Sequence, residues 1–252
     1  QNSQTQQRMT NESIVAIASM TKPITTMAVL QLFEQGLVGL DEPVSDYLPE
    51  LAGLKFRTGF DDQGRQQLKA VDPLPTLRQL LTHTSGFVYE IWNENASIAV
   101  TSGQTESAFS PGGLDVPLGF EPGERWEYGI GIDWAGRVVE KISGKPLDVY
   151  FADHIFLPLG MKDTAFSVPE PKQYRHADIH RRGPDGFLVE PGLAVSVSGG
   201  GGLQSTVSDY IQLMRCILNQ GNYNGSRLLQ PETVKLMMTN QIGDLTVGPV
   251  QS

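Results

Sequence analysis

The residues best placed to do chemistry are a hydroxyl and an amine three positions apart, Ser19 and Lys22, in the stretch Ser19-Met20-Thr21-Lys22-Pro23. On a helix, residues i and i+3 lie side by side on one face. An amine that burial keeps neutral can accept the hydroxyl proton while the serine attacks an acyl carbon. The spacing therefore indicates a serine acyl-transfer enzyme that works without a catalytic histidine.

The surroundings of this tetrapeptide predict that Ser19 lies at the start of a helix. An S-x-x-K string arises by chance about once in every one or two chains of this length, so its context matters. The apolar run 14–18 leads directly into the serine, and Pro23 suits the first turn of a helix. Apolar positions then recur with helical spacing as far as Phe33, and Gly36 is expected to end the helix. The unpaired N–H groups of a helix N-terminus favour developing negative charge at such a serine.

Composition limits the other classes of function. The chain has 252 residues and a net charge of −9, which argues against nucleic acid as a partner because phosphate binding needs a basic surface. No apolar run reaches about 18 residues, so we expect no membrane span. The single cysteine, Cys216, excludes an internal disulfide and falls in a helical pattern that predicts a buried structural thiol.

Three other motifs resemble functional sites but favour structural roles. His83, in the stretch 80–86, lies among threonines and a serine, where a histidine more often satisfies local polar groups than acts as a base. His176 and His180 have the i, i+4 spacing of a helical zinc pair, but the glutamate expected after the first histidine is absent. The glycines 199–202 lack the spacing of a phosphate loop and predict close backbone packing or a bend beside the site. We therefore expect no metal and no cofactor.

Turn and cap signals in the sequence predict the elements that must position the candidate residues. The turn signal at 60–64 predicts a small hairpin. Thr76 and Gln79 fit a capping box that opens a helix closing at Gly86. Further helices are predicted by the patterns after Ile130, Pro146, Thr206 and Pro231.

The segment from 89 to 122 is rich in Gly, Ser and Pro, which predicts a long irregular loop of the kind that carries function. Tyr89, Trp92 and Trp126 are candidates to line an apolar acyl pocket. Ordinary core or interface packing explains these aromatic residues equally well.

Three segments together point to a family. No G-x-S-x-G elbow is present, which removes the commonest alternative among serine hydrolases. The segments 19–25, 80–86 and 121–130 appear in the order and approximate spacing of serine β-lactamase-like proteins. The whole chain resembles the family VIII carboxylesterases, relatives of class C β-lactamases and D-Ala-D-Ala peptidases. The resemblance implies an α+β, β-lactamase/transpeptidase-like fold with a helical domain beside an antiparallel sheet.

The resemblance also implies roles for particular residues. Ser19 is the implied nucleophile, Lys22 its proton partner and Tyr128 the second member of the base system, with a phenolate favoured by the neighbouring ammonium. An acyl-enzyme intermediate is implied, with the Ser19 backbone N–H as one oxyanion donor. Class C β-lactamases have Asn as the third residue of the tyrosine motif, where this chain has Ile130. An apolar residue there favours simple esters, and Ile130 becomes a further candidate for substrate binding.

Part of the family pattern has no match. The later strand with its K-T-G-like or W-x-G motif is not found before Ser252, and the family's N-terminal strands are not found either. By this analogy, residues 1–252 are expected to form one incomplete catalytic domain, mainly the helical part and the catalytic helix. The missing part of its own sheet is then a candidate partner. The sequence does not identify the cellular compartment, and we take the cytoplasm as a working assumption.

We therefore expect a serine hydrolase that cleaves short-chain acyl esters through an acyl-enzyme on a Ser-Lys-Tyr centre. Its predicted partner is a small-molecule acyl ester. A β-lactamase, a D-stereospecific peptidase or an acyltransferase of the same fold are alternatives. Outside enzymes, the alternative is a non-catalytic penicillin-binding sensor or a structural module.

Overall fold

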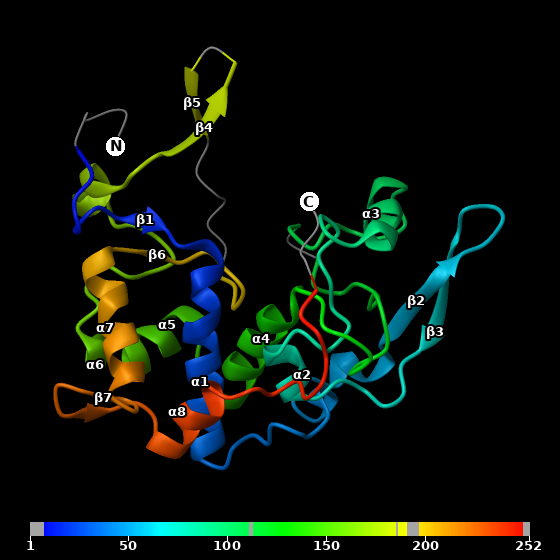
Figure 1. The fold of residues 1–252 in the computed structure, drawn as a ribbon, viewed down its shortest axis with the longest axis horizontal. Coiled ribbons are helices and arrows are strands. Elements are labelled where there is room, and N and C mark those ends of the chain that lie inside the picture. Colours follow the sequence, from blue (N-terminus) through cyan, green and yellow to red (C-terminus); the bar gives the residue numbers. More distant parts are fainter. Residues whose placement is uncertain (1–7, 111–112, 185, 191–196, 249–252) are drawn as a thin grey trace. The chain divides into compact units, whose positions relative to one another are not determined.

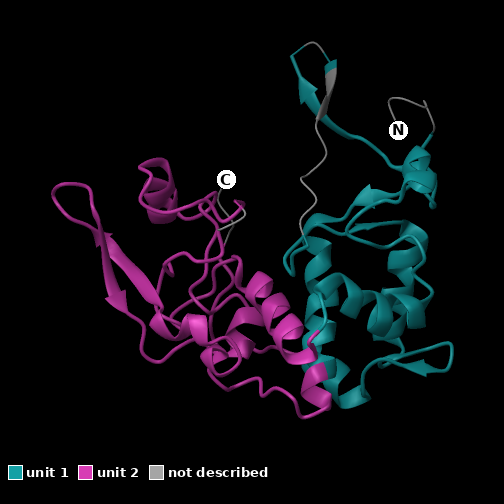
Figure 2. Cartoon of the chain, turned by 180° about the vertical axis from the view of Figure 1, so that it is seen from behind, with its two compact units in different colours: residues 1–31, 145–237 teal, residues 32–144, 238–252 magenta. Residues whose placement is uncertain are grey.

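The computed structural model describes residues 8–110, 113–184, 186–190 and 197–248 (Figure 1). The chain divides into two compact units (Figure 2). Unit 1 comprises residues 1–31 and 145–237, and unit 2 comprises residues 32–144 and 238–252. No helix in the described ranges is long and apolar enough to cross a bilayer.

Unit 1 combines helices with two-stranded antiparallel sheets. Strand β1 (Val15–Ala16) pairs with β6 (Gln204–Ser205), so segments far apart in the sequence lie side by side. The 3-10 helix η1 (Ala18–Thr21) follows β1 and continues into helix α1 (Lys22–Glu34), which ends in unit 2. The other described elements of unit 1 are α5 (Leu147–Phe151), the π-helix η4 (Ala152–Phe156), α6 (Leu157–Leu159), the 3-10 helix η5 (Glu170–Arg175), the hairpin β4 (Ile179–Gly183) and β5 (Gly186–Glu190), α7 (Val207–Leu218), the hairpin β7 (Asn222–Tyr223) and β8 (Ser226–Arg227), and α8 (Pro231–Met237).

Unit 2 contains the predicted hairpin and three helices among its described elements. These elements are the 3-10 helices η2 (Val44–Asp46) and η3 (Pro49–Gly53), strands β2 (Lys55–Phe60) and β3 (Gln66–Ala70), and helices α2 (Leu77–Leu81), α3 (Glu94–Thr101) and α4 (Gly131–Ser143). Helices α2 and α4 pack together. A Cβ added at Gly131 would lie 2.8 Å from the Leu80 carbonyl oxygen, so a glycine permits this close approach.

Local capping explains several of these helices. At α2 the predicted capping box is confirmed, because the Thr76 hydroxyl accepts from Gln79 N and the Gln79 side chain accepts from Thr76 N. At α7 the Thr206 hydroxyl accepts from Asp209 N at 3.1 Å. Helix α4 ends as predicted at Gly144, whose φ of 67° suits a glycine.

Two predicted segments differ in the structure. The stretch 89–122 is not irregular throughout, because α3 forms where the Asn93 side chain accepts from Ala96 N and so caps a helix. Helix α2 ends at Leu81 rather than near Gly86, because His83 takes a left-handed φ of 58° that cannot continue the helix.

The two histidines with zinc-pair spacing do not share a helical face. His176 follows η5, and His180 lies in strand β4, where i and i+4 spacing does not bring ring nitrogens together as it does on a helix. Within the described residues, no group of three or more His, Cys, Asp or Glu side chains is arranged to hold a metal ion.

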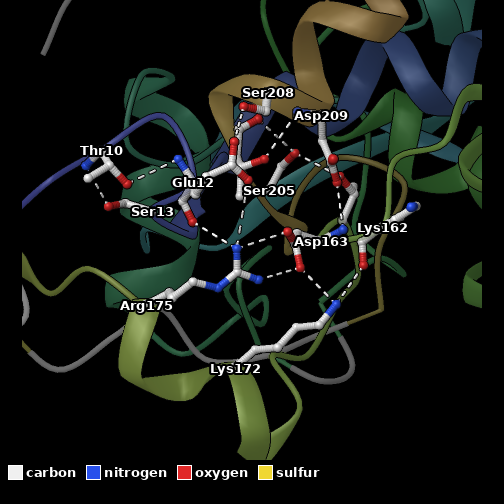
Figure 3. Close-up of polar contacts among 12 residues, drawn as sticks. Thr10, Glu12, Ser13, Lys162, Asp163, Lys172, Arg175, Ser205, Ser208 and Asp209 are labelled. Carbon is white, nitrogen blue, oxygen red and sulfur yellow. Dashed lines mark hydrogen bonds and ion pairs between the residues drawn. The ribbon is translucent and has the colours of Figure 1, made fainter.

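A polar network joins three parts of unit 1 that are distant in sequence (Figure 3). The Arg175 guanidinium contacts the Asp163 carboxylate at 2.5 Å and donates to the Glu12 carbonyl oxygen at 3.1 Å. The Asp209 carboxylate accepts from Asp163 N at 2.7 Å and from the Thr164 hydroxyl at 2.9 Å. The segment that leads into β1 is thereby tied to the start of α7.

Candidate active site

Ser19 lies on a turn whose backbone is held on its N-terminal side. Strand β1 pairs with β6, and Ile17 N then donates to the Leu203 carbonyl oxygen at 2.9 Å. The next residue, Ala18, has a φ of 44°, a left-handed conformation that costs a residue with a Cβ about 1–2 kcal/mol. This turn ends the strand pairing and starts η1, and it leaves Ser19 exposed.

The predicted contact between the hydroxyl and the amine is confirmed. The Lys22 Nζ lies 3.2 Å from the Ser19 Oγ, and it donates to the Gly200 carbonyl oxygen at 2.7 Å. Only 6% of Lys22 is exposed. A carbonyl can only accept, so the Gly200 oxygen holds one N–H of the amine. The same amine lies against the Ser19 hydroxyl, so it has a fixed position between these two oxygens.

Side chains of helix α1 bind backbone carbonyls of the glycine run. Besides the contact of Gly200 with Lys22, the Gly199 carbonyl oxygen accepts from the buried Thr25 hydroxyl at 2.7 Å. Two consecutive carbonyls therefore face one side of α1. The Gly200 carbonyl orients the Lys22 amine, whereas the reason for glycine at these positions, close packing or a bend, stays a prediction.

A contact that the sequence did not indicate supports the turn after Ser19. The Tyr210 hydroxyl on α7 donates to the Met20 carbonyl oxygen at 2.9 Å. Burial raises the pKa of Tyr210, so its phenol stays protonated and keeps this bond at neutral pH. No motif marks Tyr210, because the bond joins positions far apart in the chain.

The third predicted catalytic residue, Tyr128, lies in unit 2 among other aromatic rings. The rings around it, with their centroid separations, are His83 (4.5 Å), Trp92 (5.4 Å), Tyr89 (5.7 Å) and Trp126 (6.5 Å). The structure thus gathers the three predicted pocket aromatics next to Tyr128. Their role in substrate binding stays a prediction.

One member of this aromatic cluster, Phe109, is not marked by any motif in the sequence. Phe109 stacks on Tyr89 with ring centroids 5.2 Å apart and an angle of 11° between the ring planes. Tyr89 is buried, and burial together with the Asp133 charge raises its pKa far above the usual range, so it remains a neutral phenol. Tyr89 therefore contributes an uncharged ring to the cluster.

The residues after Tyr128 are shaped by close packing. A Cβ added at Gly129 would lie 1.9 Å from the Phe87 carbonyl oxygen, so only glycine fits between Tyr128 and Ile130. Ile130 is the residue before α4 and only 1% exposed. Its predicted influence on the choice of substrate remains a prediction.

The structure thus defines two groups of candidate residues, one in each unit. Ser19 and Lys22 are in contact in unit 1, and Tyr128 with its aromatic neighbours forms the group in unit 2. The combined Ser-Lys-Tyr centre stays a prediction.

Comparison with known proteins identifies the family. A sequence profile of the beta-lactamase family matches residues 1–248, and the chain belongs to this family. Monacolin J acid methylbutanoyltransferase of Aspergillus terreus is 36% identical over 233 residues, which cover 88% of this chain and 55% of that protein. Lovastatin esterase of Penicillium rubens is 35% identical over 259 residues, which cover 92% of this chain and 61% of that protein.

A solved structure also places this chain among the same group of proteins. Unliganded simvastatin synthase from Aspergillus terreus has a TM-score of 0.86 with this chain at 32% identity, covering 98% of this chain and 63% of that one. The β-lactamase/transpeptidase-like α+β fold predicted from the sequence is therefore confirmed. The chain spans between half and two thirds of the length of these relatives.

Proposed function

We propose that the protein is a serine acyl-transfer enzyme that takes the acyl group of a short-chain ester onto Ser19 and passes it to water. The contact of 3.2 Å between the Lys22 Nζ and the Ser19 Oγ carries this proposal. The hydroxyl is exposed to a substrate, while the amine is buried and oriented by the Gly200 carbonyl oxygen. Such a pair meets the geometric requirement for an activated nucleophile and its base.

The reaction proceeds in two steps. In acylation, the Ser19 Oγ forms a bond to the acyl carbon, its proton passes to the amine of Lys22, and the alcohol leaves with a proton returned through Tyr128. In deacylation, water gives a proton to the same groups and its oxygen bonds to the acyl carbon. The bond from that carbon to the Ser19 Oγ then breaks and the Oγ takes the proton back, which releases the acid and the free serine. The Ser19 N–H serves as one donor to the oxyanion.

An alcohol is a second candidate acceptor of the acyl group. One relative supports it by name, because it is a methylbutanoyltransferase, whereas the name of another, lovastatin esterase, fits transfer to water. Both kinds of enzyme share the acylation step and differ in whether an alcohol or water enters afterwards. The aromatic cluster around Tyr128 supports an apolar acceptor or acyl chain.

β-Lactam hydrolysis is the less favoured alternative of the same fold. A side-chain amide at the third position of the tyrosine motif suits the amide of a lactam, and this chain has Ile130 there. We infer that simple esters react faster than lactams.

The nucleophile is tested by labelling with a serine-reactive phosphonate followed by mass spectrometry of the peptides. We expect one adduct, on Ser19, and none at that position in Ser19→Ala. An adduct that persists unchanged in Ser19→Ala, or no adduct in the folded wild-type protein, would overturn the assignment.

The substrate and the acceptor are tested by measuring turnover of an ester alone, of a cephalosporin alone, and of the ester with an added alcohol. We expect hydrolysis of nitrophenyl butyrate to outpace that of a chromogenic cephalosporin. An added alcohol should produce a new butyrate ester, detected by mass spectrometry, if it competes with water. Faster lactam turnover would reverse the choice of substrate class.

A further inference from the structure

His83 holds the backbone on both sides of Tyr128. The His83 carbonyl oxygen accepts from Glu127 N at 3.0 Å, and its Nδ1 accepts from Gly129 N at 3.3 Å. The His83 ring also lies against the Tyr128 ring, with centroids 4.5 Å apart. One residue thus contacts the tyrosine and both of its neighbours in the chain.

The backbone conformation of His83 makes this double contact available. Its φ of 58° lies in the left-handed region, which most residues with a Cβ avoid but which His, Asn and Asp enter more often than others. The turn comes directly after the C-cap of α2 and is anchored on that helix, because Thr84 N donates to the Gln79 carbonyl oxygen at 3.0 Å. The segment 127–129 is therefore attached through His83 to a capped helix.

The bond at Nδ1 also determines which ring nitrogen carries the proton. A backbone N–H can only donate, so Nδ1 must accept, and the neutral ring carries its proton on Nε2. Nδ1 is occupied by the backbone and does not serve as a base.

We propose that His83 is a positioning residue for Tyr128, which holds the phenol in place for proton transfer by accepting a hydrogen bond from Gly129 N. This inference rests on the proposed function, in which Tyr128 moves the proton of the acyl-transfer steps. A displacement of about 1 Å in a reacting group lowers rates by as much as about 100-fold. Loss of the His83 acceptor therefore slows turnover without removing the binding surface for the ester.

The test compares His83→Gly with His83→Asn. Glycine keeps the left-handed backbone but removes the acceptor, whereas the Asn Oδ1 occupies nearly the position of Nδ1 and tolerates a positive φ. We expect kcat for nitrophenyl butyrate to fall about 10- to 100-fold in His83→Gly with KM changed less than about threefold, and to remain within about threefold of wild type in His83→Asn.

A double-mutant cycle with Tyr128→Phe separates positioning from general stability. Tyr128→Phe alone should lower kcat by about 10²- to 10⁴-fold, and adding His83→Gly should lower it no further, because the group being positioned is gone. Thermal unfolding of every variant confirms that it is folded. If His83→Gly does not fold, His83→Ala replaces it, since alanine has no acceptor and this chain already holds an alanine, Ala18, at a left-handed φ.

The outcomes distinguish this inference from the proposed function. Wild-type activity in Tyr128→Phe would overturn the role of the tyrosine and with it the proposed base. A slow Tyr128→Phe combined with a wild-type His83→Gly, an Asn variant as slow as the Gly variant, or multiplied losses in the double mutant would overturn only the positioning role of His83.

Discussion

At the scale of single residues, the proposed chemistry depends on one amine that is buried next to an exposed hydroxyl. The Lys22 Nζ has a fixed carbonyl partner on one side and the Ser19 Oγ on the other. A surface lysine lacks this restriction and moves freely in water. The pairing is therefore a property of the environment of Lys22 as well as of its spacing from Ser19.

Lys22→Met tests the amine directly. Methionine preserves an unbranched buried side chain and removes the proton acceptor, so we expect the rate of phosphonate labelling of Ser19 to fall about 10²- to 10⁴-fold. Mass spectrometry of timed samples measures the rate. Lys69→Met, the same change at a lysine of β3 whose side chain is 67% exposed, is the matched control and should label at the wild-type rate. Equal rates in both variants would exclude Lys22 as the base.

Cys216 provides a second prediction at this scale. The thiol is buried, and burial raises its pKa from 9.0 to about 11, so little thiolate forms at neutral pH. We expect iodoacetamide at pH 8 to leave the folded protein unmodified and to alkylate Cys216 once guanidinium chloride unfolds it. Rapid alkylation of the folded protein at pH 8 would show that the thiol is accessible or ionised.

At the scale of elements, the short helix α2 has a role beyond its length. Five residues make a helix that is marginal in isolation, so its capping box and its packing on α4 must supply stability. The turn that carries His83 starts where α2 ends. A loosened α2 is therefore expected to loosen the segment around Tyr128 as well.

The capping box of α2 is tested by Thr76→Ala. The variant leaves Gln79 N without its side-chain acceptor, so we expect the free energy of unfolding to fall by about 1 kcal/mol. Urea unfolding followed by circular dichroism measures the change. Thr76→Ser keeps the oxygen and should remain close to wild type; a serine variant as unstable as the alanine variant would point to the lost methyl group instead of the cap.

At the scale of the whole molecule, ion pairs and hydrogen bonds join segments of unit 1 that are distant in the sequence. Hydrogen bonds from Arg175 and then from Lys172 hold the pKa of Asp163 below its usual value. Folding lowers the pKa of Asp163 from 3.8, its value in the unfolded chain. Ionised Asp163 therefore stabilises the fold above pH 3.8, and this stabilisation is lost as the pH falls through the folded pKa. Burial instead raises the pKa of Asp209, so its ionisation reduces stability as the pH rises above 3.8.

Asp163→Asn should therefore destabilise the protein in a pH-dependent way. We expect a loss of about 1–3 kcal/mol in the free energy of unfolding at pH 7, where wild-type Asp163 is ionised, and a smaller loss as the pH falls below 3.8. Urea unfolding at a series of pH values measures it. Asp209→Asn is the matched control, because its amide oxygen still accepts from Asp163 N and no buried charge remains. The loss of unfolding free energy in this variant should not increase with pH. A loss in Asp163→Asn that is constant with pH would exclude the ion pair as its source.

Much of the local structure was predictable from the sequence because its causes lie within a few residues. The hairpin of β2 and β3, the caps at Thr76 and Thr206 and the helix end at Gly144 each depend on short-range hydrogen bonds or on glycine conformations. Helix α3 was missed because composition pointed to a loop, while the decisive signal was the single cap at Asn93. Its side chain also donates to the Glu127 carboxylate at 2.7 Å, a contact that spacing cannot indicate.

The sequence by itself determined that Ser19 and Lys22 are neighbours, because residues three apart at the start of a helix share one face. The tertiary structure decided how the amine is held, which aromatic rings surround Tyr128, and that His83 contacts both neighbours of that tyrosine. Apart from that between Trp126 and Tyr128, these contacts join residues tens to hundreds of positions apart. They form only when packing brings distant segments together, and no local spacing encodes that approach.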